Sequence, residues 1–256
     1  MAVRIQNLLI VACMSLFVSA PAVNAADEHA GHGAHGHMMG VPDMQADGRR
    51  LDSYGMKHEV SDEQLEGLRE KIALYRALTD REARMNMNMM GPNYEWYVSD
   101  QSFEGDTGVL VLSHGVGENS DRAFIESISP MAEKWPTAVS FGMAMMMSTH
   151  IQSAVDDLTE RGAETIVLVP TSVTEYNSLT RQYKYIFNMR DESTYLDVDR
   201  VETDANILMA RHFDDHPLIT EALLDFTNEQ SVNPANEVVI MVGHGPVSYT
   251  HLTLPT

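Results

Sequence analysis

The sequence predicts an α/β fold with a parallel sheet flanked by helices on both faces. The first observation is an apolar run in residues 108–112 that leads within two residues to His114 and a glycine. Short apolar runs rich in β-branched residues and bounded by glycine are typical of buried strands in parallel sheets. The second observation is a near copy in residues 237–245, where His244 again precedes a glycine. The third is a regular alternation of short apolar runs with amphipathic stretches, which indicates strand–helix–strand units.

Residues 1–25 have the pattern of a secretory signal peptide: basic Arg4, an apolar run over residues 8–18, and small residues up to Ala25. The run is too short to span a bilayer comfortably, so we expect cleavage near Ala25 and a periplasmic location. Two alternatives stay open, a retained N-terminal membrane anchor and lipidation at Cys13. Because Cys13 is the single cysteine, losing it with the signal would leave neither disulfides nor thiolate metal sites.

The formal net charge of −20 argues against nucleic acid and against an anionic membrane surface as partners. It is compatible with concentrating metal cations, and equally with an acidic surface that keeps the protein soluble. No later segment is apolar enough to cross a bilayer, so we expect no membrane association once the signal is removed.

Residues 26–60 are poor in large apolar side chains and rich in Gly, His and Asp, which predicts a flexible tail. Within it lie four histidines separated by small residues, His29, His32, His35 and His37. Neutral imidazoles at this density can wrap a divalent metal such as Zn, Ni, Co or Cu. Capture should fail as pH falls through about 6.5, the ordinary pKa of histidine. The alternative is a soluble linker.

Residues 61–106 are predicted to be a helical segment that packs on the domain. A capping box, Ser61 with Gln64, opens a helix expected to run to about Met85. Its apolar side chains recur at helical spacing: Leu65, Leu68, Ile72, Tyr75 and Leu78. Four of the six residues 85–90 are methionines. They favour either a soft thioether site for Cu(I) or an apolar helix end that packs into a groove.

Residues 107–232 are predicted to form the α/β domain, and residues 236–246 the first strand of a second unit. The expected strands are 109–112, 139–142, 165–169, 207–210 and, in the second unit, 238–242. The expected helices are 120–134, 151–161, 179–189 (helical or mixed) and 218–226. Short connections between these elements imply a sheet covered on both faces.

The last ten residues, 247–256, look like the in-frame translation of a sequencing adapter. We therefore expect the natural chain to continue beyond about Pro246, so that the second unit is truncated here and His251 carries no function. The alternative is a natural tail of strand-like composition.

Taken together, residues 107–246 resemble the sirohydrochlorin chelatases, or anaerobic cobaltochelatases, of tetrapyrrole and cobalamin biosynthesis. The resemblance is carried by residues 112–115 with Asn119, 139–142, 151–158 and 161–170, by His216-Pro217-Leu218, and by residues 243–245. It implies two similar α/β halves that face each other across a cleft. It also implies insertion of Co²⁺, Ni²⁺ or Fe²⁺ into a tetrapyrrole without ATP, with Co²⁺ the first expectation and Cu a further option.

Metal insertion into a tetrapyrrole releases two pyrrole protons and requires a partly dehydrated cation. An imidazole can hold the metal and accept a proton, and a carboxylate nearby can share both tasks. We therefore expect His114 to be metal ligand and base, Glu118 to be a second proton acceptor, and His244 to be a metal ligand from the second unit. The alternative for His114 is a helix-capping or loop residue.

The chain departs from the family pattern at two positions. The resemblance implies a glutamate after the second strand, where Met143 stands, and a histidine near Ser178. Glu175 is a possible substitute, and the methionines of residues 143–147 favour a softer metal. Two hypotheses therefore stay open: a chelatase acting in the periplasm, and a non-catalytic metal-binding or tetrapyrrole-binding protein with the same fold.

Overall fold

The computed structural model describes residues 9–12, 42–51 and 60–242. The chain divides into two compact units, one formed by Met39–Asp214 with Val247–Thr256 and the other by Met1–Met38 with Asp215–Pro246. The predicted domain of residues 107–232 is therefore divided at Asp215, and its last helix belongs to the other unit.

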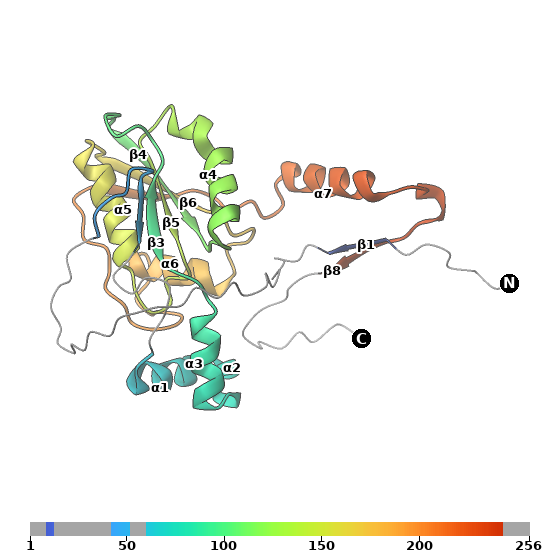
Figure 1. Ribbon diagram of the computed structural model, residues 1–256, viewed down its shortest axis with the longest axis horizontal. Coiled ribbons are helices and arrows are strands. Elements are labelled where there is room, and N and C mark those ends of the chain that lie inside the picture. Colours follow the sequence, from blue (N-terminus) through green and yellow to red (C-terminus); the bar gives the residue numbers. More distant parts are fainter. Residues whose placement is uncertain (1–8, 13–41, 52–59, 243–256) are drawn as a thin grey trace. The chain divides into compact units, whose positions relative to one another are not determined.

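The larger unit is built on a six-stranded sheet (Figure 1). Its strands, in spatial order, are β2 (Arg49–Leu51), β3 (Tyr94–Tyr97), β5 (Thr137–Phe141), β4 (Thr107–Ser113), β6 (Thr165–Pro170) and β7 (Asn206–Met209). The four strands from β5 to β7 are parallel, whereas β3 pairs with β5, and β2 with β3, in antiparallel fashion.

The fold is thus α/β with a mixed sheet, and the prediction of a wholly parallel sheet was wrong at one edge. Both antiparallel strands lie where the sequence analysis expected none. β2 falls within residues 26–60, predicted to be a flexible tail, and β3 within residues 61–106, predicted to be helical. The four strands predicted between residues 107 and 232 are confirmed to within two residues at the start and one at the end.

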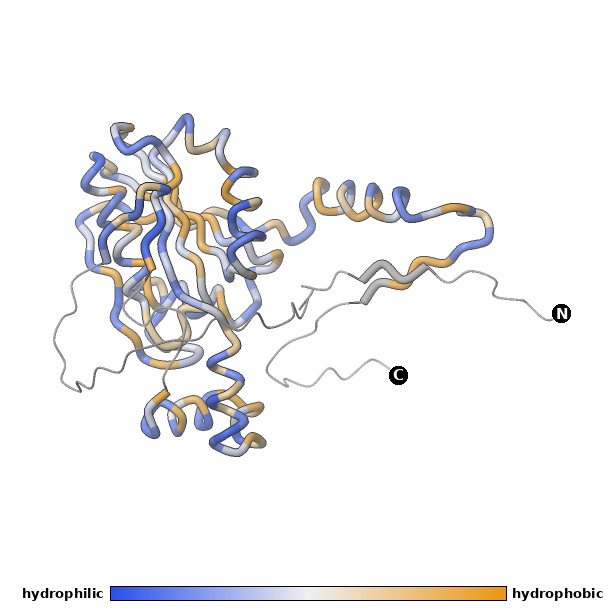
Figure 2. The backbone as a smooth tube through the Cα atoms, viewed as in Figure 1, coloured by the Kyte–Doolittle hydropathy of each residue, from blue (hydrophilic) through white to orange (hydrophobic). Residues whose placement is uncertain are grey.

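Helices cover both faces of the sheet, as predicted. On one face, α4 (Glu118–Ala132) packs apolar side chains such as Phe124 and Ile128 against Val111 and Val139. On the other, α5 (Thr149–Glu160) and α6 (Ser178–Ile186) pack against the alternate strand residues, including Leu110. Figure 2 shows the hydrophobic colouring running along the central strands. This two-layer burial fixes the register, because a slip of one residue would exchange the two faces.

The helix predicted from Ser61 to about Met85 is broken into three: α1 (Asp62–Lys71), α2 (Ala73–Ala77) and α3 (Asp80–Asn88). The predicted capping box of Ser61 and Gln64 is confirmed. The breaks lie at Ile72 and Leu78, both with extended backbone angles. The segment packs on the domain through a cluster that includes Leu65 and Leu68.

The smaller unit contains β1 (Leu9–Ala12), α7 (Pro217–Gln230), a 3₁₀ turn (Pro234–Asn236) and β8 (Val239–Val242). β1 and β8 pair in parallel, Leu9 opposite Val239. β1 lies in the apolar core of the predicted signal peptide, so this pairing exists only before cleavage if that prediction holds. Among the described residues, no helix combines the length and apolar character that a membrane span requires.

Candidate functional site

The carboxyl ends of the parallel strands lead into His114 and into other side chains that the sequence analysis considered for chemistry. Ligands of open α/β sheets bind at this edge. His114 follows β4, Met143 lies two residues beyond β5, Thr171 follows β6, and His212 lies three residues beyond β7. The backbone N–H of Gly142 donates to Ser113 O at 2.9 Å, so the chain segments leaving β4 and β5 start side by side.

His114 is exposed at this edge, directly after the predicted strand β4. Its Nδ1 lies 2.6 Å from the carbonyl oxygen of Gly115. A carbonyl can only accept, so Nδ1 carries the proton and Nε2 of the neutral ring keeps a free lone pair. Gly115 has φ +73°, a backbone conformation that favours glycine. The ring is therefore oriented by its own loop, with Nε2 available to a metal or a proton.

Asp121 holds the His114 loop in place, and the sequence analysis missed it. Its Oδ1 accepts from the backbone N–H groups of Val116 (2.9 Å) and Gly117 (3.4 Å). Its Oδ2 accepts a hydrogen bond from the Tyr94 hydroxyl at 2.6 Å. Asp121 is buried, with 5% of its surface exposed. Burial, and then the bond to Asp121, raises the pKa of Tyr94 far above its usual value, so the phenol stays a donor. The available signal was an acidic residue in the first turn of α4.

Glu118, the predicted second proton acceptor, is committed to two arginines. Its Oε1 lies 3.0 Å from Arg122 and 3.3 Å from Arg49. The hydrogen bond from Arg122, and then the charge of Arg49, lowers the pKa of Glu118. A carboxylate held ionised by two guanidinium groups is a poor proton acceptor. These contacts argue against a role for Glu118 as base.

Met143 and Ser178, the two positions at which the chain departs from the family pattern, contact residues other than His114. Met143 is half-buried and packs against the cluster formed with α1–α3. Ser178 opens α6, and its hydroxyl lies 2.7 Å from that of Tyr195. Glu175, the suggested substitute, lies 3.7 Å from Lys184 Nζ. None of the three presents a metal ligand to His114 through a contact seen here.

His212 is the second histidine at this edge, and the sequence analysis gave it no role. Its Nε2 lies 2.9 Å from Thr180 Oγ1, a buried hydroxyl that also accepts from Asn177 and contacts Ser172. Burial lowers the pKa of His212, although nearby Asp214 and Glu175 oppose the shift. The signal was its position, since it follows a strand almost as closely as His114 does. Two strand spacings of about 4.8 Å separate β4 from β7.

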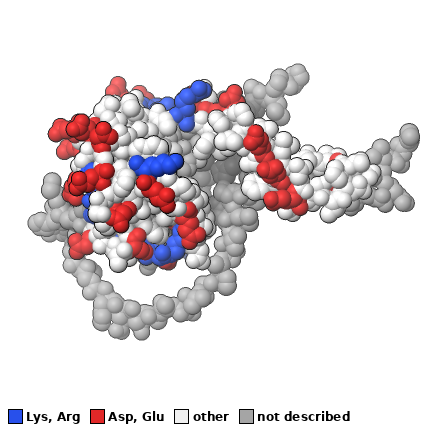
Figure 3. Space-filling view, turned by 90° about the horizontal axis from the view of Figure 1, so that it is seen from above, with Lys and Arg blue, Asp and Glu red and all other residues white. Residues whose placement is uncertain are grey.

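Other predicted ligands cannot be placed. His29, His32, His35, His37 and His244 lie outside the described residues. Within residues 9–12, 42–51 and 60–242, no three His, Cys, Asp or Glu side chains are arranged to hold a metal ion. The face seen in Figure 3 carries acidic side chains more widely than basic ones, consistent with the net charge of −20.

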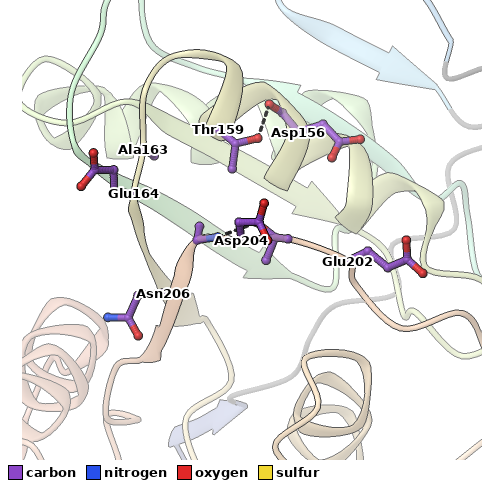
Figure 4. A pocket seen from close by; sticks show the side chains of 9 residues that line it. Asp156, Thr159, Ala163, Glu164, Glu202, Asp204 and Asn206 are labelled. Atoms are coloured by element: carbon purple, nitrogen blue, oxygen red, sulfur yellow. Dashed lines mark hydrogen bonds between the residues drawn. The ribbon is translucent and has the colours of Figure 1, made fainter.

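An open hollow of about 570 Å³ lies elsewhere (Figure 4). Its lining includes the carboxylates Asp156, Glu164, Glu202 and Asp204, together with Asn206. Glu164 precedes β6 and Asn206 begins β7, so the hollow lies at the amino ends of these strands. It is therefore at the edge opposite His114, away from the expected chemistry.

In comparisons with known proteins, no family model matches this chain and no curated protein matches it. The family resemblance therefore remains a prediction carried by the motifs themselves.

Proposed function

We propose that the chain is a secreted, chelatase-like protein that inserts a divalent metal, Co²⁺ first and Ni²⁺ or Fe²⁺ next, into a sirohydrochlorin-type tetrapyrrole without ATP. The α/β unit would correspond to one half of such a chelatase, and β8 with His244 would open a second. The supporting observation is the exposed His114 ring at the carboxyl edge of the sheet, with Nδ1 fixed by Gly115 O.

The chemistry assigns His114 two successive tasks. Insertion converts M²⁺ and a tetrapyrrole with two N–H groups into the metallated ring and two protons. The lone pair of His114 Nε2 first holds the cation, and after transfer to the ring the same atom accepts one proton. Asp121 positions this loop through Val116 and Gly117. The second proton goes to solvent or to a group outside the described residues.

The test is the rate at which Co²⁺ enters sirohydrochlorin, followed by absorbance with the full chain. The wild type should exceed the uncatalysed rate. His114→Ala should remove most of the enhancement, because a positioned acid–base group contributes about 10²–10⁴-fold. His216→Asn is the matched control: His216 accepts from Leu218 N at the start of α7, and asparagine can do the same.

Two results would contradict the proposal. Insertion by the wild type no faster than the uncatalysed reaction removes the enzymatic function. Equal rates for wild type and His114→Ala remove His114 from the mechanism.

A second candidate is a non-catalytic metal-binding or tetrapyrrole-binding protein. It is favoured by the ion pairs that occupy Glu118 and by Met143 and Ser178 at the expected ligand positions. This candidate predicts a His114-dependent shift in the sirohydrochlorin spectrum without any increase in insertion rate. The same absorbance experiment therefore separates the two functions.

A further inference from the structure

The fold brings together two methionine-rich segments that lie far apart in the sequence. Met87 and Met90 come from the end of α3 and the residues after it, and Met143, Met145 and Met146 from the loop after β5. All five belong to, or pack against, a single apolar cluster that also contains Leu65 and Tyr75. Figure 1 shows α1–α3 together at one end of the sheet. Five methionine side chains from two distant segments therefore contribute to one cluster, and the loop that carries three of them leaves β5 at the same edge as His114.

The cluster has an inner and an outer layer. Met87 and Met145 are buried, at 1% and 3% exposure. Met90, Met143 and Met146 are half-buried, so solvent reaches them while the neighbouring side chains exclude most of it. The Tyr75 hydroxyl lies 2.9 Å from Met87 Sδ, so this sulfur already contacts a hydrogen-bond donor. The three outer thioethers are the ones that an incoming ion can reach.

The loop that carries three of these methionines holds an unfavourable backbone conformation. Ala144 has φ +50° although it is not glycine, and it is fully buried. Gly142 has φ +133°, and a Cβ there would lie 1.9 Å from Asn93 Oδ1. Strain of this kind is concentrated at binding sites, where the surrounding structure enforces it. Here it sets the direction of the chain between Met143 and Met145.

From this convergence we propose that Met90, Met143 and Met146 form a binding site for a soft monovalent cation, Cu(I). Neutral thioether sulfur is a soft ligand that selects Cu(I) over harder divalent ions. Cys13 is the single cysteine, so thioethers are the main soft ligands of the chain, and 18 of its 256 residues are methionine. The site is distinct from the divalent-metal role of His114 and does not depend on a tetrapyrrole.

The test is competition between the full chain and bicinchoninate for Cu(I), under ascorbate and without oxygen. Both arms carry His29, His32, His35 and His37 changed to alanine, which removes the four tail imidazoles as ligands, and both keep the tail methionines Met38 and Met39 unchanged. The variant is Met90→Leu/Met143→Leu/Met146→Leu. Leucine is close to methionine in volume, so packing is retained while sulfur is lost.

We expect the triple variant to bind Cu(I) at least about tenfold more weakly, since changing even an outer partner of a metal ligand typically costs 10–100-fold. The matched control is Met85→Leu/Met89→Leu/Met131→Leu. Met85 and Met89 are 56% and 68% exposed, and Met131, which lies in α4, packs against the separate cluster that contains Val111 and Val139. This control should bind Cu(I) as the parent does. Equal affinity in parent and triple variant, or equal loss in the control, would overturn the proposal.

X-ray absorption at the copper edge of the tail-substituted parent gives an answer even if the triple variant does not fold. A sulfur shell around copper is expected, and a shell of nitrogen and oxygen alone would overturn the proposal. Failure here leaves the cobalt insertion assay with His114→Ala untouched, because that assay contains no copper.

Discussion

Two neighbouring arginines connect the short strand β2 to helices on opposite faces of the sheet. Successive side chains of a strand point to opposite faces. Arg49 lies toward α4, over the Trp96 ring at 5.6 Å, and pairs with Glu118. Arg50 lies toward α5, 2.7 Å from Asp157 and 3.5 Å from Glu95. The two arginines therefore offer a matched pair of ion-pair sites, one at the surface and one in the interior.

The two sites differ in solvent access. The Glu118 side chain is 59% exposed, whereas those of Asp157 and Glu95 are 3% and 0% exposed. Water screens the ion pair at the first site, and each of its charges stays hydrated even without its partner. In the second, a charge without its partner would remain buried, which is costly. The ion pairs of Arg49 and Arg50 are similar in geometry, but losing them should change stability by different amounts.

Burial in the interior site also favours a proton shared between Glu95 and Asp157. Burial, and then the negative charge of Asp157, raises the pKa of Glu95 well above its ordinary value of 4.5. As a carboxylate, Glu95 has no hydrogen-bond donor within the described residues. A proton on Glu95 supplies a donor toward Asp157, and Arg50 then balances the remaining charge. The exposed site shows the reverse, because the pKa of Glu118 is lowered by its arginines.

Arg50→Ala should give the largest effect. It leaves Asp157 buried without its closest cation, and breaking a buried pair typically costs about 3–5 kcal/mol. The measurement is the free energy of unfolding in urea, with the neighbouring Arg49→Ala as control. A loss below about 1 kcal/mol, the usual upper range for surface pairs, would mean that the two sites do not differ as described.

The second prediction concerns pH and the shared proton. Because the pKa of Glu95 is raised on folding, the folded chain holds a proton that the unfolded chain has released above about pH 4.5. Glu95 should therefore make the protein less stable as pH rises above 4.5, by at most about 1.4 kcal/mol per pH unit. Glu95→Gln, which resembles the protonated acid, should flatten this slope in urea unfolding between pH 5 and pH 8.

Other groups also titrate in this range, so the comparison is between slopes. The lowered pKa of His212 makes stability rise with pH on approaching 6.5, and it does so in both proteins. The difference between wild type and Glu95→Gln isolates Glu95. Identical slopes would show that Glu95 is ionised throughout.

These buried charges explain which strands the sequence could predict. The run of residues 109–112 is apolar without interruption, so β4 was predictable from local pattern alone. β3 contains Glu95, which reads as a solvent-facing residue and is in fact fully buried. Its partner Arg50 lies 45 positions earlier in the sequence, on β2, and faces Glu95 across the two paired strands. No local pattern contains that pairing, so both antiparallel strands, β2 and β3, were missed.

The same reasoning applies to the helices and the site. Thr79 and Glu82 form a capping box that begins α3, a visible signal that the helix predicted from Ser61 does not continue unbroken. His114 was predictable because it directly follows an apolar strand. Asp121 was not, because its role depends on the Tyr94 hydroxyl from an unpredicted strand. The methionine cluster needed the fold to bring its two segments together.

Arg49→Ala should give the smallest effect and completes the comparison. Its partner Glu118 is largely exposed and keeps Arg122 at 3.0 Å, so the loss should stay below about 1 kcal/mol. Raising the salt concentration should shrink that loss further, because exposed ion pairs are screened, whereas the Arg50→Ala loss should change little. Urea unfolding at low and high sodium chloride measures both. An Arg49→Ala loss that equals the Arg50→Ala loss and ignores salt would show that packing over Trp96, rather than solvent access, decides the strength of these sites.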